Sequence, residues 1–107
     1  HTAARYQIPV VYVLINNDAL GNVYLRAREL GNTAKELTSI PDHDWASFAK
    51  ALGVQAETVR DPSHLKEVFQ RAFSAGVPYL IDIKCDKNFP TPVEPFAETK
   101  KNWSYHY

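Results

Sequence analysis

Two amides and a carboxylate follow one another at Asn16, Asn17 and Asp18, directly after a run of apolar residues. Amide and carboxylate oxygens are hard ligands of the kind that Mg²⁺ takes in proteins. A helix beginning just after them would favour a phosphate group at its N-terminus, and Gly21 would let the backbone approach that group closely. A magnesium-bound diphosphate fits both features. The same residues also fit plain turn formation and helix capping, so both interpretations stay open at this point.

The apolar patterns on either side predict the elements that hold this segment. Residues 10–15 form a continuous, largely β-branched run, which is typical of a parallel strand buried on both faces. After the segment, helical spacing places four apolar residues on one face, and Gly31 marks the expected helix end. These four residues are Leu20, Val23, Tyr24 and Ala27. Open α/β sheets bind ligands beyond the carboxyl ends of their strands, where the polar segment would lie.

A second helix is predicted after a polar connection at residues 32–41. Asp42 or Asp44 can cap it, and Gly53 ends it. A short strand is expected at residues 56–60. The second helix itself would present one apolar face, formed by Trp45, Phe48, Ala49 and Leu52.

A third helix is predicted by the pair Asp61 and Pro62, an N-cap followed by proline at the first helical position. Gly76 closes this helix, and residues 79–83 form the last strand. The buried face of the helix repeats at helical spacing through Leu65, Val68, Phe69, Ala72 and Phe73. We expect the aromatic residues of both helices to lie in the core.

Strands that alternate with helices predict an α/β fold, a parallel sheet with helices on both faces. Residues 1–85 would form this domain, and the proline-rich residues 86–107 an extended C-terminal tail. Three strands are few for such a sheet. The residues before Gln7 resemble the last turns of a helix without a start signal. We therefore expect a domain truncated at its N-terminus, the C-terminal portion of a longer chain.

Composition excludes several classes of function. The 107 residues carry twelve Lys and Arg and twelve Asp and Glu, a balance that argues against binding to nucleic acid or a membrane surface. No apolar run approaches the roughly 20 residues needed to span a bilayer. The single cysteine, Cys85, excludes an internal disulfide framework and a cysteine-rich zinc site. A cytoplasmic location is the default expectation.

Several residues outside the polar segment have plain structural interpretations. His43 and His64 fit caps or surface positions, and Cys85 fits a small buried or half-buried residue. Asp82 interrupts an apolar strand, so it is either a hydrogen-bonded structural carboxylate or a group facing a ligand. Arg26 and Arg28 fit a solvated helix face.

The order of motifs resembles the thiamine-diphosphate enzymes of the acetolactate synthase, pyruvate oxidase and 2-oxo acid decarboxylase superfamily. The resemblance covers roughly residues 2–96. It rests on residues 2–11, on Leu14 to Asn17 with Leu20 and Gly21, on residues 41–45 and 51–54, and on the closing strand at residues 77–83. In that family the Asn-Asn pair ends a motif that begins with Gly-Asp-Gly some two dozen residues earlier, which would lie upstream of His1.

The resemblance implies roles for six residues. Asn17 would give its side-chain oxygen and Ala19 its backbone carbonyl to Mg²⁺, with the diphosphate and an upstream aspartate completing the shell. Asn16, Leu20 and Gly21 would shape the turn and the diphosphate pocket. Val23 stands where pyruvate decarboxylases carry an acidic catalytic residue, and an apolar residue there is similar to acetolactate synthases. No catalytic residue can be assigned in this chain.

The implied function is that of a fragment of a thiamine-diphosphate- and magnesium-dependent lyase or transferase. The intact enzyme would decarboxylate a 2-oxo acid and pass the bound carbanion to an acceptor, by carboligation or by oxidation. Its partners would be the rest of the enzyme, including a glutamate-bearing domain, in a homodimer or homotetramer. The fragment alone would be inactive. Two alternatives are a non-catalytic α/β interaction or regulatory module that has lost the cofactor, and a free-standing flavodoxin-like domain.

Overall fold

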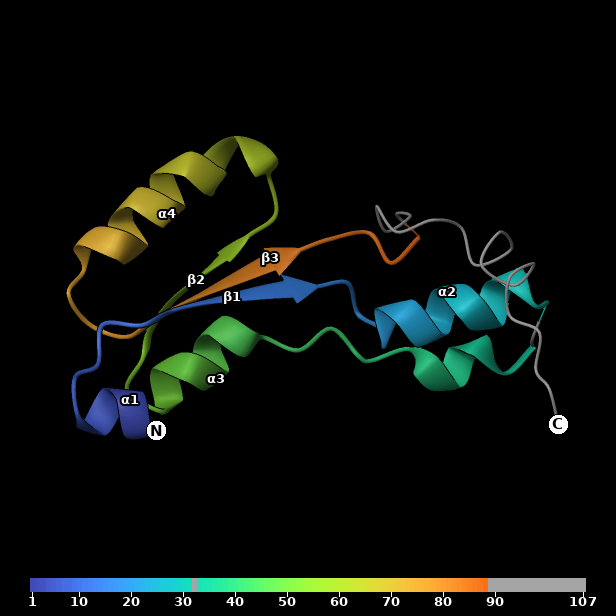
Figure 1. Ribbon diagram of the computed structural model, residues 1–107, viewed down its shortest axis with the longest axis horizontal. Helices are drawn as coiled ribbons and strands as arrows, with labels where there is room; N and C mark the ends of the chain where they lie inside the picture. Colours follow the sequence, from blue (N-terminus) through green and yellow to red (C-terminus); the bar gives the residue numbers. More distant parts are fainter. Residues whose placement is uncertain (32, 89–107) are drawn as a thin grey trace, which may run out of the picture. The chain divides into compact units, whose positions relative to one another are not determined.

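The computed structural model describes residues 1–31 and 33–88, which fall into two compact units (Figure 1). The first unit contains residues 1–16 and 42–85 and holds the sheet. The second contains residues 17–41, together with residues 86–88 of the described chain. The expected extended tail falls at residues 86–107, and its part from 89 onward lies outside the described residues.

The sheet of the first unit has three parallel strands, β1 (Val11–Asn16), β2 (Gln55–Val59) and β3 (Tyr79–Lys84). Their order is β1-β3-β2, so β3 lies in the centre. In register, Leu14 and Thr58 flank Asp82, and Asn16 is the partner of Lys84. The predicted parallel α/β arrangement is confirmed, with strand bounds that differ from expectation by one residue.

Helices cover both faces of this sheet, as predicted. On one face lie α3 (Trp45–Ala51) and the short α1 (Thr2–Arg5), packed through a cluster of small residues: Ala46, Ala49, Val54 and Ala56, with Ala4 and Leu80 beside them. On the other face lies α4 (Leu65–Ser74). Its core cluster consists of Val59, Val68, Ala72, Tyr79 and Ile81. The two clusters fix the sheet between two helical layers.

The start of α4 follows the predicted signal. The Asp61 carboxylate accepts a hydrogen bond from the Ser63 amide at 2.8 Å. Pro62 then opens the 3₁₀ turn η2 (Pro62–His64), which leads directly into α4. The capping bond lowers the pKa of Asp61, because it stabilises the charged carboxylate.

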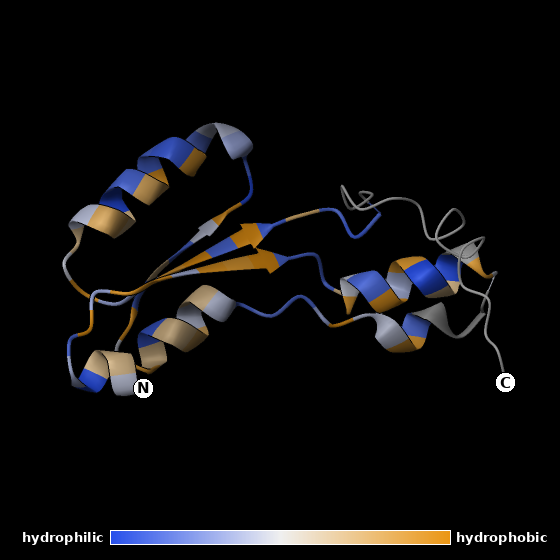
Figure 2. Ribbon diagram, in the orientation of Figure 1, coloured by the Kyte–Doolittle hydropathy of each residue, from blue (hydrophilic) through white to orange (hydrophobic). Residues whose placement is uncertain are grey.

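The expected burial of β1 on both faces is wrong for the described chain. Tyr12 and Val13 are each 44% exposed, and Ile15 is 62% exposed. The reason is topological: β1 is an edge strand that pairs only with β3, and Val11 is its one residue beside the core cluster under α4. Figure 2 shows that much of β1 is nevertheless hydrophobic. The apolar pattern indicated a strand correctly but did not indicate its neighbours.

Two of the expected core aromatics are also exposed. Phe48 is 58% exposed and Phe73 is 71% exposed. In α3 the positions that face the sheet are Ala46 and Ala49, because small side chains let the helix approach β2 closely. Phe48 instead lies edge-on to Trp45, at 6.1 Å between ring centroids.

The second unit contains α2 (Gly21–Glu29) and the 3₁₀ helix η1 (Thr33–Thr38). The 3₁₀ helix lies in the predicted polar connection, where no element was expected. Of the four residues expected on one face of α2, Tyr24 is 7% exposed, whereas Leu20 and Val23 are 54% and 52% exposed. Within residues 1–31 and 33–88, no helix has the length and apolar character that a membrane crossing requires.

Candidate functional site

The polar segment begins where the sheet ends. Asn16 is the last residue of β1 and is 8% exposed. Its carbonyl accepts a hydrogen bond from the amide of Cys85, the residue after β3, at 2.8 Å. This bond extends the β1–β3 ladder past the last strand residue. The chain therefore leaves the sheet at a fixed point, immediately before Asn17.

The turn after Asn17 is held by a short antiparallel bridge inside the second unit. Asp18 adopts a positive φ of 52°, a conformation that aspartate tolerates better than most residues. Ala19 pairs with Ser39, and the bridge bonds run from Leu20 N to Thr38 O and from Ile40 N to Asp18 O, both 2.8 Å. In such a pair the central residue's own carbonyl points away from its partner. The Ala19 carbonyl is thus directed away from Ser39.

The side chain of Asn17 lies against the first residue of α2. A Cβ placed on Gly21 would come within 2.4 Å of Asn17 Nδ2, a separation that real Cβ atoms do not adopt. Glycine at this position therefore makes room for the Asn17 amide beside the helix N-terminus. The backbone amides of a helix N-terminus favour an anionic group. An amide oxygen, a carbonyl that points away from its bridge partner and a helix N-terminus fit a magnesium-bound diphosphate.

The apolar neighbours of this turn are exposed. Leu20 and Val23 present about half of their surface, although both belong to a turn that is otherwise held by hydrogen bonds. Tyr24, the next residue, is buried, and its hydroxyl donates to Asn88 Oδ1 at 3.4 Å. Arg28 Nη1 donates to the same oxygen at 3.1 Å, and both Arg26 and Arg28 are exposed, as the sequence predicted.

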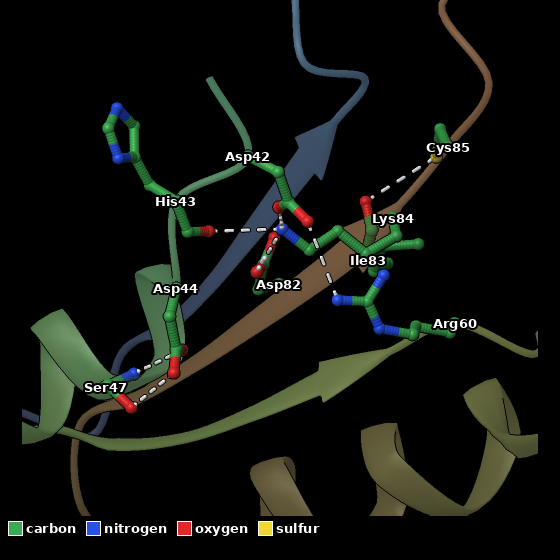
Figure 3. A network of polar contacts seen from close by, with 9 residues as sticks. All are labelled: Asp42, His43, Asp44, Ser47, Arg60, Asp82, Ile83, Lys84 and Cys85. Carbon is green, nitrogen blue, oxygen red and sulfur yellow. Dashed lines mark hydrogen bonds and ion pairs between the residues drawn. The ribbon is translucent and has the colours of Figure 1, made fainter. Parts of the chain in front are cut away.

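A polar network that sequence reasoning missed lies at the carboxyl end of β3 (Figure 3). Lys84 Nζ hydrogen-bonds to the Asp42 carboxylate, donates to the His43 carbonyl at 3.2 Å, and lies 3.2 Å from Asp82 Oδ2. Arg60 lies 3.7 Å from Asp42 at an exposed position. Lys84 could be paired with Asp82 from the sequence, since i and i+2 share a face of a strand. Its contact with Asp42 joins residues that are 42 positions apart in the chain, so no local pattern indicated it.

The network changes the acidity of its members. The hydrogen bond from Lys84 lowers the pKa of Asp42, against a smaller opposing effect of burial. Burial acts to lower the pKa of Lys84, but its hydrogen bonds to Asp42 and Asp82 together raise it. Lys84 therefore stays charged near neutral pH. Asp82 is fully buried, and its Oδ1 has no hydrogen-bond partner among the described residues. Its Oδ2 forms the ion pair with Lys84.

The cap of α3 is Asp44, one of the two candidates left open by the sequence. Its carboxylate accepts hydrogen bonds from the Ser47 amide at 2.9 Å and the Ser47 hydroxyl at 2.6 Å. The hydroxyl and amide bonds together lower the pKa of Asp44. Asp42 does not cap α3, and its carboxylate binds Lys84 instead.

A second ion-pair cluster lies on the opposite face of the sheet. Arg71 of α4 binds Glu57 of β2 and Glu67 of its own helix, and Tyr79 also hydrogen-bonds to Glu57. The Arg71 hydrogen bonds lower the pKa of Glu57. Burial and the Glu57 hydrogen bond raise the pKa of Tyr79. None of these residues belongs to the polar segment or its ends.

The remaining candidates have no common site. His43 and His64 are exposed, as expected. Cys85 is exposed, so the expected burial of its side chain is wrong: it follows the end of β3, beyond the covering helices. Among the residues that the structure describes, no three His, Cys, Asp or Glu side chains form a metal-binding cluster.

Comparison with known proteins gives consistent relatives. The chain is 32% identical over 95 residues to the "Probable acetolactate synthase large subunit" of Methanocaldococcus jannaschii, covering 88% of this chain and 16% of that protein. It is 30% identical over 95 residues to the mitochondrial acetolactate synthase catalytic subunit of Aspergillus candidus, covering 88% and 14%. The chain thus spans about a sixth of these relatives.

A solved structure agrees with the sequence relatives. The thiamine diphosphate-dependent 4-hydroxybenzoylformate decarboxylase of Rhodococcus jostii matches with a TM-score of 0.72 and 27% identity, over 79% of this chain and 16% of that one. Residues 1–83 match the family described as the thiamine pyrophosphate enzyme, C-terminal TPP binding domain. The chain therefore belongs to the thiamine pyrophosphate enzymes, within their C-terminal cofactor-binding domain.

Proposed function

We propose that the segment from Asn16 to Gly21 holds thiamine diphosphate through a magnesium ion. Asn17 would provide its side-chain oxygen and Ala19 its backbone carbonyl as metal ligands. The observation that carries this proposal is the approach of Asn17 to Gly21, where a Cβ would lie 2.4 Å from the Asn17 amide. The direction of the Ala19 carbonyl, which points away from Ser39 in their bridge, supports it.

The neighbouring residues would complete the pocket. Asn16 and Gly21 shape the two ends of the turn, and Gly21 leaves the helix N-terminus open to the diphosphate. Leu20 and Val23 expose apolar side chains, which would cover the cofactor and exclude water from it. Bound thiamine diphosphate supplies the carbon nucleophile that the decarboxylation of a 2-oxo acid requires.

In the intact protein we propose decarboxylation of a 2-oxo acid followed by carboligation, as in an acetolactate synthase, or by oxidation, as in a pyruvate oxidase. The names of the relatives favour carboligation. Val23 agrees with this choice, because an apolar residue there leaves no proton donor at that position. Several further points stay predictions. They are the domain of residues 1–85, the magnesium dependence, the glutamate-bearing domain, the dimeric or tetrameric assembly, the cytoplasmic location and the inactivity of the isolated fragment.

A non-catalytic module that kept the fold and lost the cofactor is the alternative. It would not need glycine at position 21, since nothing would then require the Asn17 amide beside the helix. The two proposals differ in a simple measurement, the binding of thiamine diphosphate by the intact protein.

The experiment titrates thiamine diphosphate into the intact protein with Mg²⁺ and with a chelator, using calorimetry. Wild-type protein should bind only with Mg²⁺, and Asn17→Ala should weaken binding by at least about tenfold. Asn22→Ala is the matched control, because Asn22 is an exposed amide in the same turn of α2. Equal losses in both variants, or no binding by the wild type, would overturn the proposal.

A further inference from the structure

Two consecutive residues at the end of β3 hold both ends of the segment 17–41. The outgoing end is fixed by the hydrogen bond from the Cys85 amide to the Asn16 carbonyl, at 2.8 Å. The returning end is fixed by Lys84, which hydrogen-bonds to the Asp42 carboxylate and donates to the His43 carbonyl at 3.2 Å. Both attachments lie within the first unit. The segment between them carries Asn17 and Ala19.

The inward position of Lys84 follows from the pleat of β3. Leu80, Asp82 and Lys84 alternate with Tyr79, Ile81 and Ile83, so the first three point to the α3 face. The Lys84 side chain is 11% exposed and lies beside the fully buried Asp82. A buried lysine is costly unless it is paired, and here carboxylates from both β3 and the returning chain pair with it.

Capping of α3 does not explain the contact between Lys84 and Asp42. Asp44 caps that helix through Ser47, independently of Lys84. Lys84 also binds a main-chain carbonyl, at His43, and so restrains the backbone as well as one side chain. Figure 3 shows the ammonium group between the returning chain and Asp82. Lys84 thus restrains the chain at the point where it returns to the sheet.

We propose that Lys84 is a positioning residue for the cofactor segment. By holding Asp42 and His43 it restricts the returning end of segment 17–41, and so pre-organises the segment for its ligand. This inference rests on the proposed function, because it gives Lys84 a role in binding thiamine diphosphate. Lys84 itself touches neither metal nor cofactor in the proposal.

The test compares two carboxylates in matched clusters of the intact protein. Asp42→Ala removes the more exposed partner of Lys84 and leaves the Lys84–Asp82 pair in place. Glu67→Ala does the same to Arg71, which keeps Glu57. The side chains of Asp42 and Glu67 are 49% and 69% exposed, so neither truncation opens a cavity. Of the two contacts that these variants remove, only the contact between Lys84 and Asp42 holds an end of segment 17–41.

Amide hydrogen exchange is measured without cofactor, and thiamine diphosphate affinity is measured at saturating Mg²⁺. Asp42→Ala should speed exchange within residues 17–41 and raise the dissociation constant about tenfold, whereas Glu67→Ala should change neither. Asp42→Glu should recover part of the affinity. Equal exchange and equal affinity in the Asp42→Ala and Glu67→Ala variants would overturn the inference.

The two proposals fail in different ways. If the wild-type protein binds no thiamine diphosphate, the proposed function is wrong, and the cofactor role of Lys84 is wrong with it. If the wild type binds but Asp42→Ala leaves both exchange and affinity unchanged, only the role of Lys84 is wrong. Lys84→Met is a second variant for the same readouts, with Arg71→Met as its control.

Discussion

The Asn17 amide occupies the space that a side chain on Gly21 would need. A Cβ on Gly21 would lie 2.4 Å from Nδ2 and 3.4 Å from Cγ of Asn17. Gly21 is also the first residue of α2, where alanine would otherwise favour the helix. Helix stability and the position of Asn17 therefore make opposite demands on residue 21.

This conflict predicts the outcome of Gly21→Ala. The variant should fold, because the atom that must move is the end of a single side chain, that of Asn17. Its affinity for thiamine diphosphate with Mg²⁺ should fall at least about tenfold, since Asn17 must move away from the helix N-terminus. Calorimetric titration of the intact variant measures this. Wild-type affinity in Gly21→Ala would show that Asn17 does not act from this position.

The ion pair between the fully buried Asp82 and the mostly covered Lys84 predicts a stability effect. Lys84→Met should destabilise the protein by about 3 kcal/mol, because it leaves the fully buried Asp82 carboxylate without its ion-pair partner. Adding Asp82→Leu to Lys84→Met should restore much of the loss, since an apolar pair needs no compensation. Urea denaturation gives both values. A single variant as stable as the double variant would contradict this account.

The cap of α3 predicts a difference between two neighbouring aspartates. Asp44→Ala should lower the urea midpoint, because the Ser47 amide loses its acceptor at the start of the helix. Asp44→Asn should retain most of the stability, since asparagine caps equally well. Asp44→Ala should leave thiamine diphosphate affinity unchanged, in contrast to Asp42→Ala. A loss of thiamine diphosphate affinity in Asp44→Ala would contradict the separation between the capping role of Asp44 and the role of Asp42 in holding the segment.

Glu57 and Arg71 predict a pH dependence of stability. Arg71 lowers the pKa of Glu57 below its ordinary value of 4.5, so Glu57 binds protons more weakly in the folded state than in the unfolded state. Its contribution is therefore complete above pH 4.5 and is lost as the pH falls through the folded-state pKa. The stability difference between wild type and Arg71→Met should shrink over that range. A difference independent of pH would contradict the pairing.

Local signals in the sequence predicted the elements well. The pair Asp61 and Pro62 predicted the start of α4, because capping depends only on residues close in the chain. The apolar run of β1 predicted a strand, but its burial depends on which neighbours flank it, and those are set by topology. Phe48 and Phe73 failed as core residues for a similar reason: helical spacing defines a face without fixing which side contacts the sheet.

The candidate site was predicted in part. The polar run that includes Asn17 and the glycine at position 21 stand out in the sequence, because polar residues and glycine are typical of a turn between a strand and a helix. The role of Ala19 as a metal ligand comes only from the family resemblance, and all of these site assignments stay predictions. Lys84 was missed, since its contact with Asp42 joins residues far apart in the chain. Asp42 was considered only as a helix cap, and the choice between Asp42 and Asp44 required the structure.

A crystal structure of the intact protein with thiamine diphosphate and Mg²⁺ tests the central claim most directly. The account predicts one metal ion bound by Asn17 Oδ1 and the Ala19 carbonyl, each at about 2.1 Å, with diphosphate oxygens beside the N-terminus of α2. Gly21 should lie in contact with the diphosphate. A metal ion held by other residues, with the Asn17 side chain turned away from it, would contradict the account.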